Sequence, residues 1–474
     1  MAQRITSLTE PTERRTVTQP TLFGFPTDII IFGFIMLHIP LALTMRNMPV
    51  ISPLHQVLTL GLGLWWLWTE ATPRRVIYTI GYITGAEFLW RGLLTSLVWE
   101  FSKYAVILLV VSALFRFRRL GAADKRPAVY FLLLVPAISM LPGFDRGAIS
   151  YNLAGPLALA VATMFFSTVS LTREEFLRLL VAIIAPVVAF GTIAAQALFQ
   201  ESGFSVGWVE QFGGNQVSSI LGLGAMAAIF YAFAERRRRS VAVLMALIAL
   251  VLLGEAVLSF SRGGVWTTVG AILAGLFFLI RERRFQLTVL ALTVAVAAAA
   301  YFFILPAIDD YTGGRVVPRF QDFDTTGRDE LVLSDLRIFM DYPFTGVGPG
   351  QTRPYHARLQ IGATLTHTEY SRLLSEHGLL GLLALLLLAW MAAERLFKPV
   401  PHEERGYRVG FTMWGLLFMA WAATRLVAPS FAFALGAARL LVDERPENEE
   451  AEQRTRVLSH YHHRRSVHPV NGQQ

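Results

Sequence analysis

The feature that most constrains this chain is a series of long apolar blocks. Each block holds about 18 to 25 residues, the length of α-helix that crosses about 30 Å of hydrocarbon. Apolar and polar residues do not alternate within the blocks, which argues against half-buried strands. Hydrophobic residues make up 54% of the 474 residues, and charged residues only 16%. The sequence therefore predicts an all-α, polytopic integral membrane protein.

About 12–14 transmembrane helices are expected from these blocks. The predicted spans are 27–46, 52–69, 74–90, 97–116, 127–143, 153–171, 176–199, 215–234, 240–258, 263–280, 285–305, 371–396 and 407–426. A shorter apolar stretch, 428–442, follows them. The predicted organisation is a cytoplasmic segment 1–22, a transmembrane domain 23–442 and a cytoplasmic tail 443–474.

Short basic clusters between the blocks set the predicted orientation. They are PRR (73–75), RFRR (116–119), ERRRR (235–239), RERR (281–284) and ERLFK (394–398). With the N-terminus inside, every cluster falls on the cytoplasmic side, as the positive-inside rule requires. This topology accounts for the formal net charge of +8 without a nucleic-acid partner. It also places one long, partly helical loop, 306–370, in the periplasm.

Arg262 stands in LSFSRGGVW (258–266), between two apolar blocks on the predicted outer side. It is therefore no positive-inside anchor, and its charge must either reach the interface or face a wet cavity. Glu255, about two helical turns deeper, is a candidate cavity residue. Two further charged pairs, Glu87 with Arg91 and Glu100 with Lys103, have the spacing of ion pairs on one helix face. The absence of cysteine excludes disulfides, thiolate metal sites and thiol catalysis.

The outer loop carries three further signals. A helix is predicted over 325–343, with Thr326 and Asp329 at capping-box spacing and Pro343 at its end. GVGPG (346–350) lacks the dinucleotide-binding spacing and predicts a tight turn that brings the backbone close to another group. His367 precedes the next span, where it is either an interfacial polar residue or a base that titrates near neutral pH.

Together, these motifs resemble the O-antigen ligase and O-antigen polymerase superfamily. They are the SRGG turn, the loop's R-helix-P-x-x-G-x-G segment, and H-x-E-Y ahead of an E-x-G-x-x-G helix, over roughly residues 210–390. The resemblance implies a glycosyltransferase of the bacterial inner membrane that acts in lipopolysaccharide biosynthesis. The donor would be a glycan on undecaprenyl diphosphate at the periplasmic face. The acceptor would be lipid A–core for a ligase, or a second carrier-linked glycan for a polymerase. The resemblance implies no cofactor and a metal-independent reaction.

The resemblance also implies roles for single residues. Arg262 and Arg328 match the family's arginines and would bind the diphosphate, since a guanidinium presents a planar fork to phosphate oxygens. His367 matches the histidine of the family's H-N-x-Y motif and would deprotonate the acceptor. Thr368 stands where the family usually has Asn. Further substrate-binding candidates are Gly263, Gly264, Asn215, Glu369 and Tyr370.

Three alternatives stay open on the sequence alone. A ligase and a polymerase would use the same constellation of residues, with ligation slightly favoured. A transporter of lipid-linked glycans also has many spans and buried charges, but the chain shows no convincing internal repeat. A structural membrane scaffold explains none of the motifs.

Overall fold

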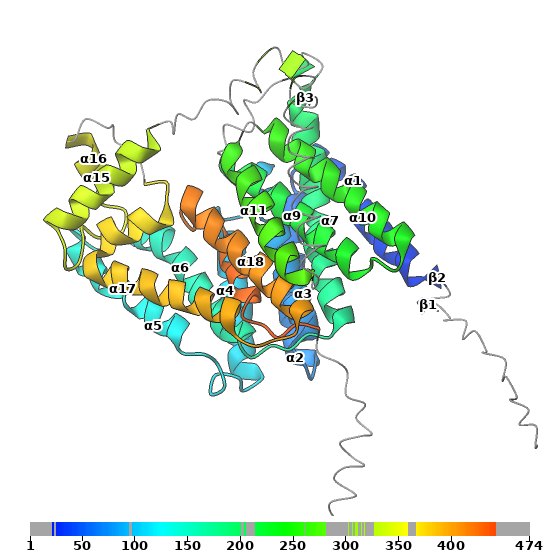
Figure 1. Ribbon diagram of the computed structural model, residues 1–474, viewed down its shortest axis with the longest axis horizontal. Helices are drawn as coiled ribbons and strands as arrows, with labels where there is room; N and C mark the ends of the chain where they lie inside the picture. The colour runs from blue at the N-terminus through cyan, green and yellow to red at the C-terminus, as the bar shows by residue number, and fades with distance from the viewer. Residues whose placement is uncertain are drawn as a thin grey trace, which may run out of the picture.

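The computed structural model is almost entirely helical (Figure 1). It describes residues 21–22, 25–93, 97–200, 203–204, 214–259, 261–280, 327–358 and 366–441, with a few single positions between 302 and 317. Its strands have two residues each and form two hairpins, β1 (Thr21–Leu22) with β2 (Phe25–Pro26) and β3 (Phe199–Gln200) with β4 (Gly203–Phe204). The predicted all-α class is confirmed.

The first half of the chain forms a group of helices that ends at Leu198. They are α1 (Thr27–Asn47), α2 (Ile51–Thr69), α3 (Arg74–Gly92), α4 (Phe101–Arg116), α5 (Arg126–Leu132), the 3-10 helix η1 (Val135–Met140), α6 (Arg146–Phe166) and α7 (Arg173–Leu198). The second half contributes α9 (Gly214–Ala234), α10 (Arg239–Leu258), α11 (Arg262–Leu279), α15 (Arg328–Asp341), α16 (Thr352–Arg358), α17 (Glu369–Phe397), α18 (His402–Trp421) and α19 (Val427–Leu435).

Seven of the described helices are long and apolar enough to cross a membrane: α1, α6, α7, α9, α10, α11 and α17. The chain is therefore a multi-pass membrane protein. Helices α3 and α18 have similar lengths, 19 and 20 residues, but carry internal charges such as Glu87 and Arg408. The predicted span 285–305, the tail 443–474 and most of the segment 1–22 lie outside the described residues.

Two predicted apolar spans have a different form. The stretch 127–143 is a seven-residue helix, α5, followed by the six-residue 3-10 helix η1, with Pro136 in the first turn of η1. Proline cannot donate a backbone hydrogen bond and is favoured in the first turn of a helix, so Pro136 suits the start of a new element after α5. The stretch 428–442 contains α19, whose nine residues reach only about 14 Å. Helix α19 begins from a buried turn, residues 422–426, and does not cross a bilayer alone.

The predicted basic turns lie at one end of the helix bundle, called here the basic end. Arg74 pairs with Glu175, and Arg119 donates to the carbonyl of Thr168. Arg236 pairs with Glu403 at 3.1 Å. Arg126 and Glu394 form a further salt bridge at this end. The backbone of Arg439 also hydrogen-bonds there to the turn between α6 and α7. The alternation of spans predicted from the basic clusters therefore agrees with the fold, and the cluster 281–284 lies outside the described residues.

The opposite end, called here the site end, carries α15 and α16 beside the first turns of α17 (Figure 1). Helix α11 packs along α18 and against α9, so that the start of α11 lies at this end. The close approach of α11 to α9 depends on Gly264, where a Cβ atom would lie only 2.0 Å from Ser218 Oγ. Small residues allow such contacts between membrane helices.

Gly264→Ala should destabilise the protein, whereas Gly254→Ala should not. A methyl group at 264 overlaps Ser218, and overpacking of this kind costs about 1–3 kcal/mol. Gly254, on α10, has no atom within 4 Å of a Cβ position, so alanine there should be neutral or add about 0.5–1 kcal/mol. Thermal unfolding of both variants in the same detergent checks this. Equal melting temperatures would contradict the packing of α11 on α9.

Candidate functional site

Asp335 joins the elements of the site end. Its side chain is fully buried, and its Oδ1 atom accepts hydrogen bonds from His356 Nε2 and Thr366 Oγ1, both at 3.0 Å. Its Oδ2 atom accepts from Ser371 Oγ at 2.6 Å. These bonds connect α15 and α16 to the segment 366–368 and to the first turn of α17. A buried carboxylate with three partners is strongly directional, so Asp335 fixes the segment that carries His367.

His367 lies directly before α17, and the cap of that helix sets its position. Thr368 is the N-cap residue, and its Oγ1 atom accepts a hydrogen bond from the backbone N–H of Ser371 at 3.0 Å. Asparagine and threonine are both favoured at helix N-caps. The departure from the H-N-x-Y pattern therefore keeps a residue that can cap the helix behind the histidine.

The surroundings of His367 favour its neutral form. Partial loss of solvation lowers the pKa of the imidazole, and the positive charges of Arg328 and Arg425 lower it further. The carboxylate of Asp335 opposes this shift only partly. The ring itself remains exposed. A neutral, accessible imidazole can accept a proton. The charges of Arg328 and Arg425 are near enough to His367 to act on its pKa.

Arg425 was not among the sequence-predicted site residues. It stands in the buried turn 422–426, donates from Nη2 to the carbonyl oxygen of Thr366 at 3.1 Å, and lies over the ring of Tyr151 at 5.4 Å. Within the described residues it forms no salt bridge with a carboxylate. The available signal was a charge inside the predicted span 407–426, which in membranes marks functional sites.

Two carboxylates hold the buried turn in place. Glu369 accepts from the backbone N–H of Thr424 and from its Oγ1 atom, both at 2.9 Å. It also pairs with Arg372 at 2.6 Å. Glu87 accepts from the backbone N–H of Val427 at 2.9 Å. Glu369 is thus occupied by internal partners, and it positions the turn that carries Arg425.

The predicted charged pairs form one buried network beside this turn. Arg91 lies 3.0 Å from Glu87 and 3.6 Å from Glu100, and Glu100 pairs with Lys103. Arg91 also donates to the carbonyl oxygen of Arg425 at 3.4 Å. Both helix-face ion pairs predicted from the spacing are confirmed, and they stabilise the turn from the side of α3 and α4.

Arg262 is the first residue of α11 and is half-buried. The residue before it, Ser261, donates to Asn215 Oδ1 at the start of α9. A Cβ atom at Gly263 would lie 3.0 Å from Asn215 Oδ1 and 3.2 Å from Trp421, which is four residues before Arg425. Asn215 and Gly263 therefore help to set the start of α11 next to the end of α18.

The remaining predicted residues contact neighbouring helices. Tyr370 donates from its hydroxyl to the carbonyl oxygen of Leu416 at 2.7 Å, which ties α17 to α18. Gly264 packs on Ser218. Glu255 lies against Gly191 of α7, and its Oε2 atom has no hydrogen-bond partner among the described residues. Among those residues no group of three His, Asp or Glu side chains is placed to hold a metal ion.

The start of α15 differs from the predicted capping box. The helix begins at Arg328, and its N-cap residue is Gly327, which has a φ of 75° and no side-chain cap. Glycine adopts this left-handed conformation without the strain of a Cβ atom. Asp329 lies in the first turn, and Thr326 is outside the described residues. The predicted end before Pro343 is confirmed, since α15 ends at Asp341.

The GVGPG turn docks on a kink in α17. Gly346, Gly348 and Gly350 all have positive φ, and the backbone N–H groups of Val347 and Gly348 donate to the carbonyls of Ser375 and Glu376 at 3.0 Å. These carbonyls precede Gly378, whose φ of 61° breaks the helix. The predicted tight turn is confirmed, and the group that its backbone approaches is α17.

Comparison with known families matches one segment of the chain. A family model described as O-antigen ligase matches residues 247–386, from within α10 to within α17. This segment is similar to that family. Arg262, Arg328 and His367 lie inside the matched segment, whereas Asn215 and Arg425 lie outside it. No curated protein matches the chain. The predicted resemblance to the O-antigen ligase and polymerase superfamily is thus confirmed over these residues.

If His367 is the base, kcat/KM should stay high below the usual histidine range. The pKa of this imidazole is lowered, so the neutral form persists to lower pH, and kcat/KM should fall only as pH drops through a value below 6.5. Arg328→Gln removes one cation, so the falling limb should move to higher pH. Arg337→Gln, on the same helix, is the matched control and should leave the limb unchanged. An unchanged pH profile in Arg328→Gln would contradict the electrostatic effect of Arg328 on His367.

Proposed function

We propose that the protein transfers a glycan from an undecaprenyl-diphosphate carrier to a hydroxyl group of lipid A–core. The reaction takes place at the periplasmic face of the bacterial inner membrane, and the site end faces the periplasm. The observation that carries the proposal is that Arg328 and Arg425 both lower the pKa of His367, within or near the segment that is similar to the O-antigen ligase family. The proposed organisation keeps the transmembrane domain 23–442, the periplasmic loop 306–370 and the cytoplasmic ends 1–22 and 443–474.

The chemistry requires two things of the protein. The bond from the anomeric carbon to the diphosphate oxygen breaks, and the electron pair leaves with the diphosphate. Arginines close to that oxygen stabilise the developing charge, and they do so more strongly at low dielectric than in water. Arg262 and Arg328 are assigned this role.

The acceptor must also lose a proton. Its hydroxyl oxygen attacks the anomeric carbon from the side opposite the diphosphate, so the configuration inverts. His367 takes the hydroxyl proton as general base and then releases it to water. A general base of this kind contributes about 10²- to 10⁴-fold to the rate. No metal or other cofactor takes part in these steps.

Purified protein with carrier-linked glycan and acceptor tests the assignment. His367→Ala should bind the carrier but lose about 10²- to 10⁴-fold in transfer rate. Arg262→Lys should also transfer poorly, because an ammonium group does not reproduce the bidentate guanidinium contact. His402→Ala, an exposed histidine at the basic end, is the matched control and should be fully active. Wild-type turnover by His367→Ala would end the assignment of the base.

The same assay separates transfer from transport. A lipid-linked glycan transporter, the alternative from another class, needs two compartments, whereas a transferase forms product in detergent without vesicles. Surface glycan from a deletion strain then separates the two members of the superfamily. Intact long chains left on the carrier indicate a ligase, and single unpolymerised repeats indicate an O-antigen or exopolysaccharide polymerase.

A further inference from the structure

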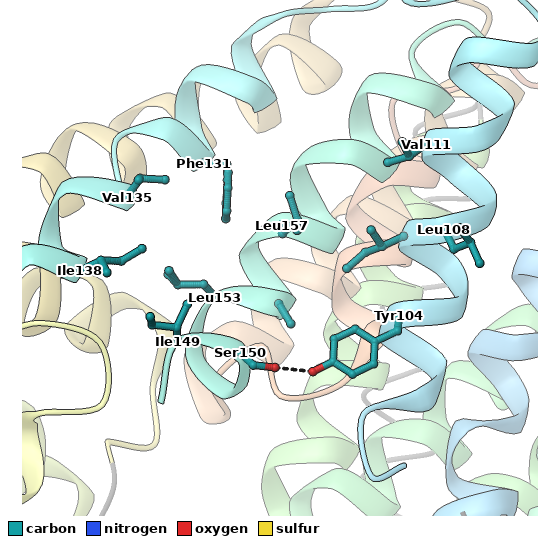
Figure 2. Close-up of a pocket in the computed structure, with 12 residues that line it drawn as sticks. Tyr104, Leu108, Val111, Phe131, Val135, Ile138, Ile149, Ser150, Leu153 and Leu157 are labelled. Carbon is teal, nitrogen blue, oxygen red and sulfur yellow. Dashed lines mark hydrogen bonds between the residues drawn. The ribbon is translucent and has the colours of Figure 1, made fainter. Parts of the chain in front are cut away.

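An apolar cavity of about 600 Å³ lies between α4, α6 and the broken helix α5–η1 (Figure 2). Its volume is within the range of small-molecule sites. Figure 2 shows that the three elements direct apolar side chains into the same space. These side chains include Leu108 and Val111 of α4, Phe131 and Val135 of α5–η1, and Leu153 and Leu157 of α6. We call this space the α4–α6 groove.

The broken helix forms one wall of the groove. Helix α5 ends at Leu132 and η1 begins at Val135, and both elements contribute lining residues. Lining residues remain accessible from outside the bundle, with Leu108 46% and Tyr104 41% exposed. Both residues are on α4, which lies within the predicted span 97–116, so we expect a hydrocarbon chain to enter the groove sideways from the bilayer.

The groove has one polar end, and that end leads to the candidate site. Tyr104 and Ser150 hydrogen-bond to each other there (Figure 2). The next residue along α6, Tyr151, lies under the guanidinium of Arg425, which in turn contacts the carbonyl of Thr366 beside His367. Two contacts therefore connect the rim of the groove with the residue that precedes the base.

The cation at this end, Arg425, forms no direct salt bridge among the described residues. Arg425 has hydrogen-bonding and ring partners but no carboxylate within salt-bridge distance among the described residues. A half-buried guanidinium that no carboxylate contacts directly can bind an anionic ligand such as a phosphate. An apolar groove that ends at such a cation fits a lipid with a single chain and a phosphate head.

We propose that the α4–α6 groove holds the isoprenoid chain of the donor, with Arg425 in contact with its diphosphate. The inference rests on the proposed function, because only a carrier-linked donor must place its diphosphate beside the base. The donor has one chain, which suits a single groove, whereas lipid A carries several acyl chains. Since bilayer lipid is as apolar as the groove, selectivity comes from packing and from the phosphate contact.

Photo-crosslinking tests the groove directly. Full-length protein in lipid nanodiscs is illuminated with undecaprenyl diphosphate that carries a diazirine in its chain, and the labelled peptides are identified. Labels are expected on residues 104–111 and 150–157. Leu108→Trp fills the groove and should lower this labelling roughly fivefold, the effect of mild overpacking. Leu247→Trp, a 54% exposed leucine on α10, is the matched control and should label like wild type.

Kinetics give an independent readout. Leu108→Trp, or Val111→Trp if the first variant unfolds, should raise the KM for the donor and leave the KM for the acceptor unchanged. Arg425→Gln should weaken binding of undecaprenyl diphosphate but not of undecaprenol, which lacks phosphate. Labels elsewhere, equal labelling by a diazirine phospholipid, or a changed KM for the acceptor alone would each overturn the assignment of the groove.

The outcomes also separate this inference from the proposed function. If the wild-type protein transfers glycan but no label appears in the groove, the proposed function holds and the groove is not the chain-binding site. If the groove is labelled but no acceptor receives glycan, the groove binds the carrier and the proposed transferase function is wrong.

Discussion

The buried carboxylate of Glu369 is the interaction on which the site end depends. Its two oxygen atoms accept both hydrogen bonds from Thr424 and face the guanidinium of Arg372. Removing one partner from a buried ion pair costs about 3–5 kcal/mol, because the remaining charge is left uncompensated. This penalty keeps the turn 422–426 buried at the first turn of α17, instead of at the protein surface.

Three segments far apart in sequence meet around that turn. The segment 366–368 is held by Asp335, the turn itself carries Arg425, and the start of α11 reaches the end of α18 through Gly263 and Trp421. Each segment is fixed by side-chain hydrogen bonds or by close backbone packing. A site of this kind is preorganised, so little rearrangement is needed when charge develops on a leaving diphosphate.

Much of the fold could be predicted from the sequence, because membrane helices correspond to long apolar blocks with basic clusters between them. The charged pairs of α3 and α4 and the glycine turn at 346–350 also follow, since their spacing alone determines them. Hydropathy fails for α5 and α19, because it measures apolar character and not whether the helix is continuous. The nine helical residues of α19 and the turn before it look like parts of two ordinary spans.

The candidate site was predictable where a motif marked it and not elsewhere. Arg262, Arg328 and His367 stand in recognisable motifs, whereas Arg425 and Asp335 acquire their roles only from contacts across 59 and 31 positions of the chain. Those contacts depend on tertiary packing, which no local pattern specifies. Glu369 illustrates the same limit, because its place beside His367 suggested substrate binding while its contacts are with Thr424.

The most direct test of this site is a cryo-EM structure of the protein with undecaprenyl diphosphate bound. We expect the diphosphate at the site end, with guanidinium groups of Arg262, Arg328 and Arg425 at about 2.7–3.2 Å from its oxygen atoms and His367 on the side of the acceptor. A diphosphate bound at the basic end, near Arg395 and Arg408, would contradict this assignment.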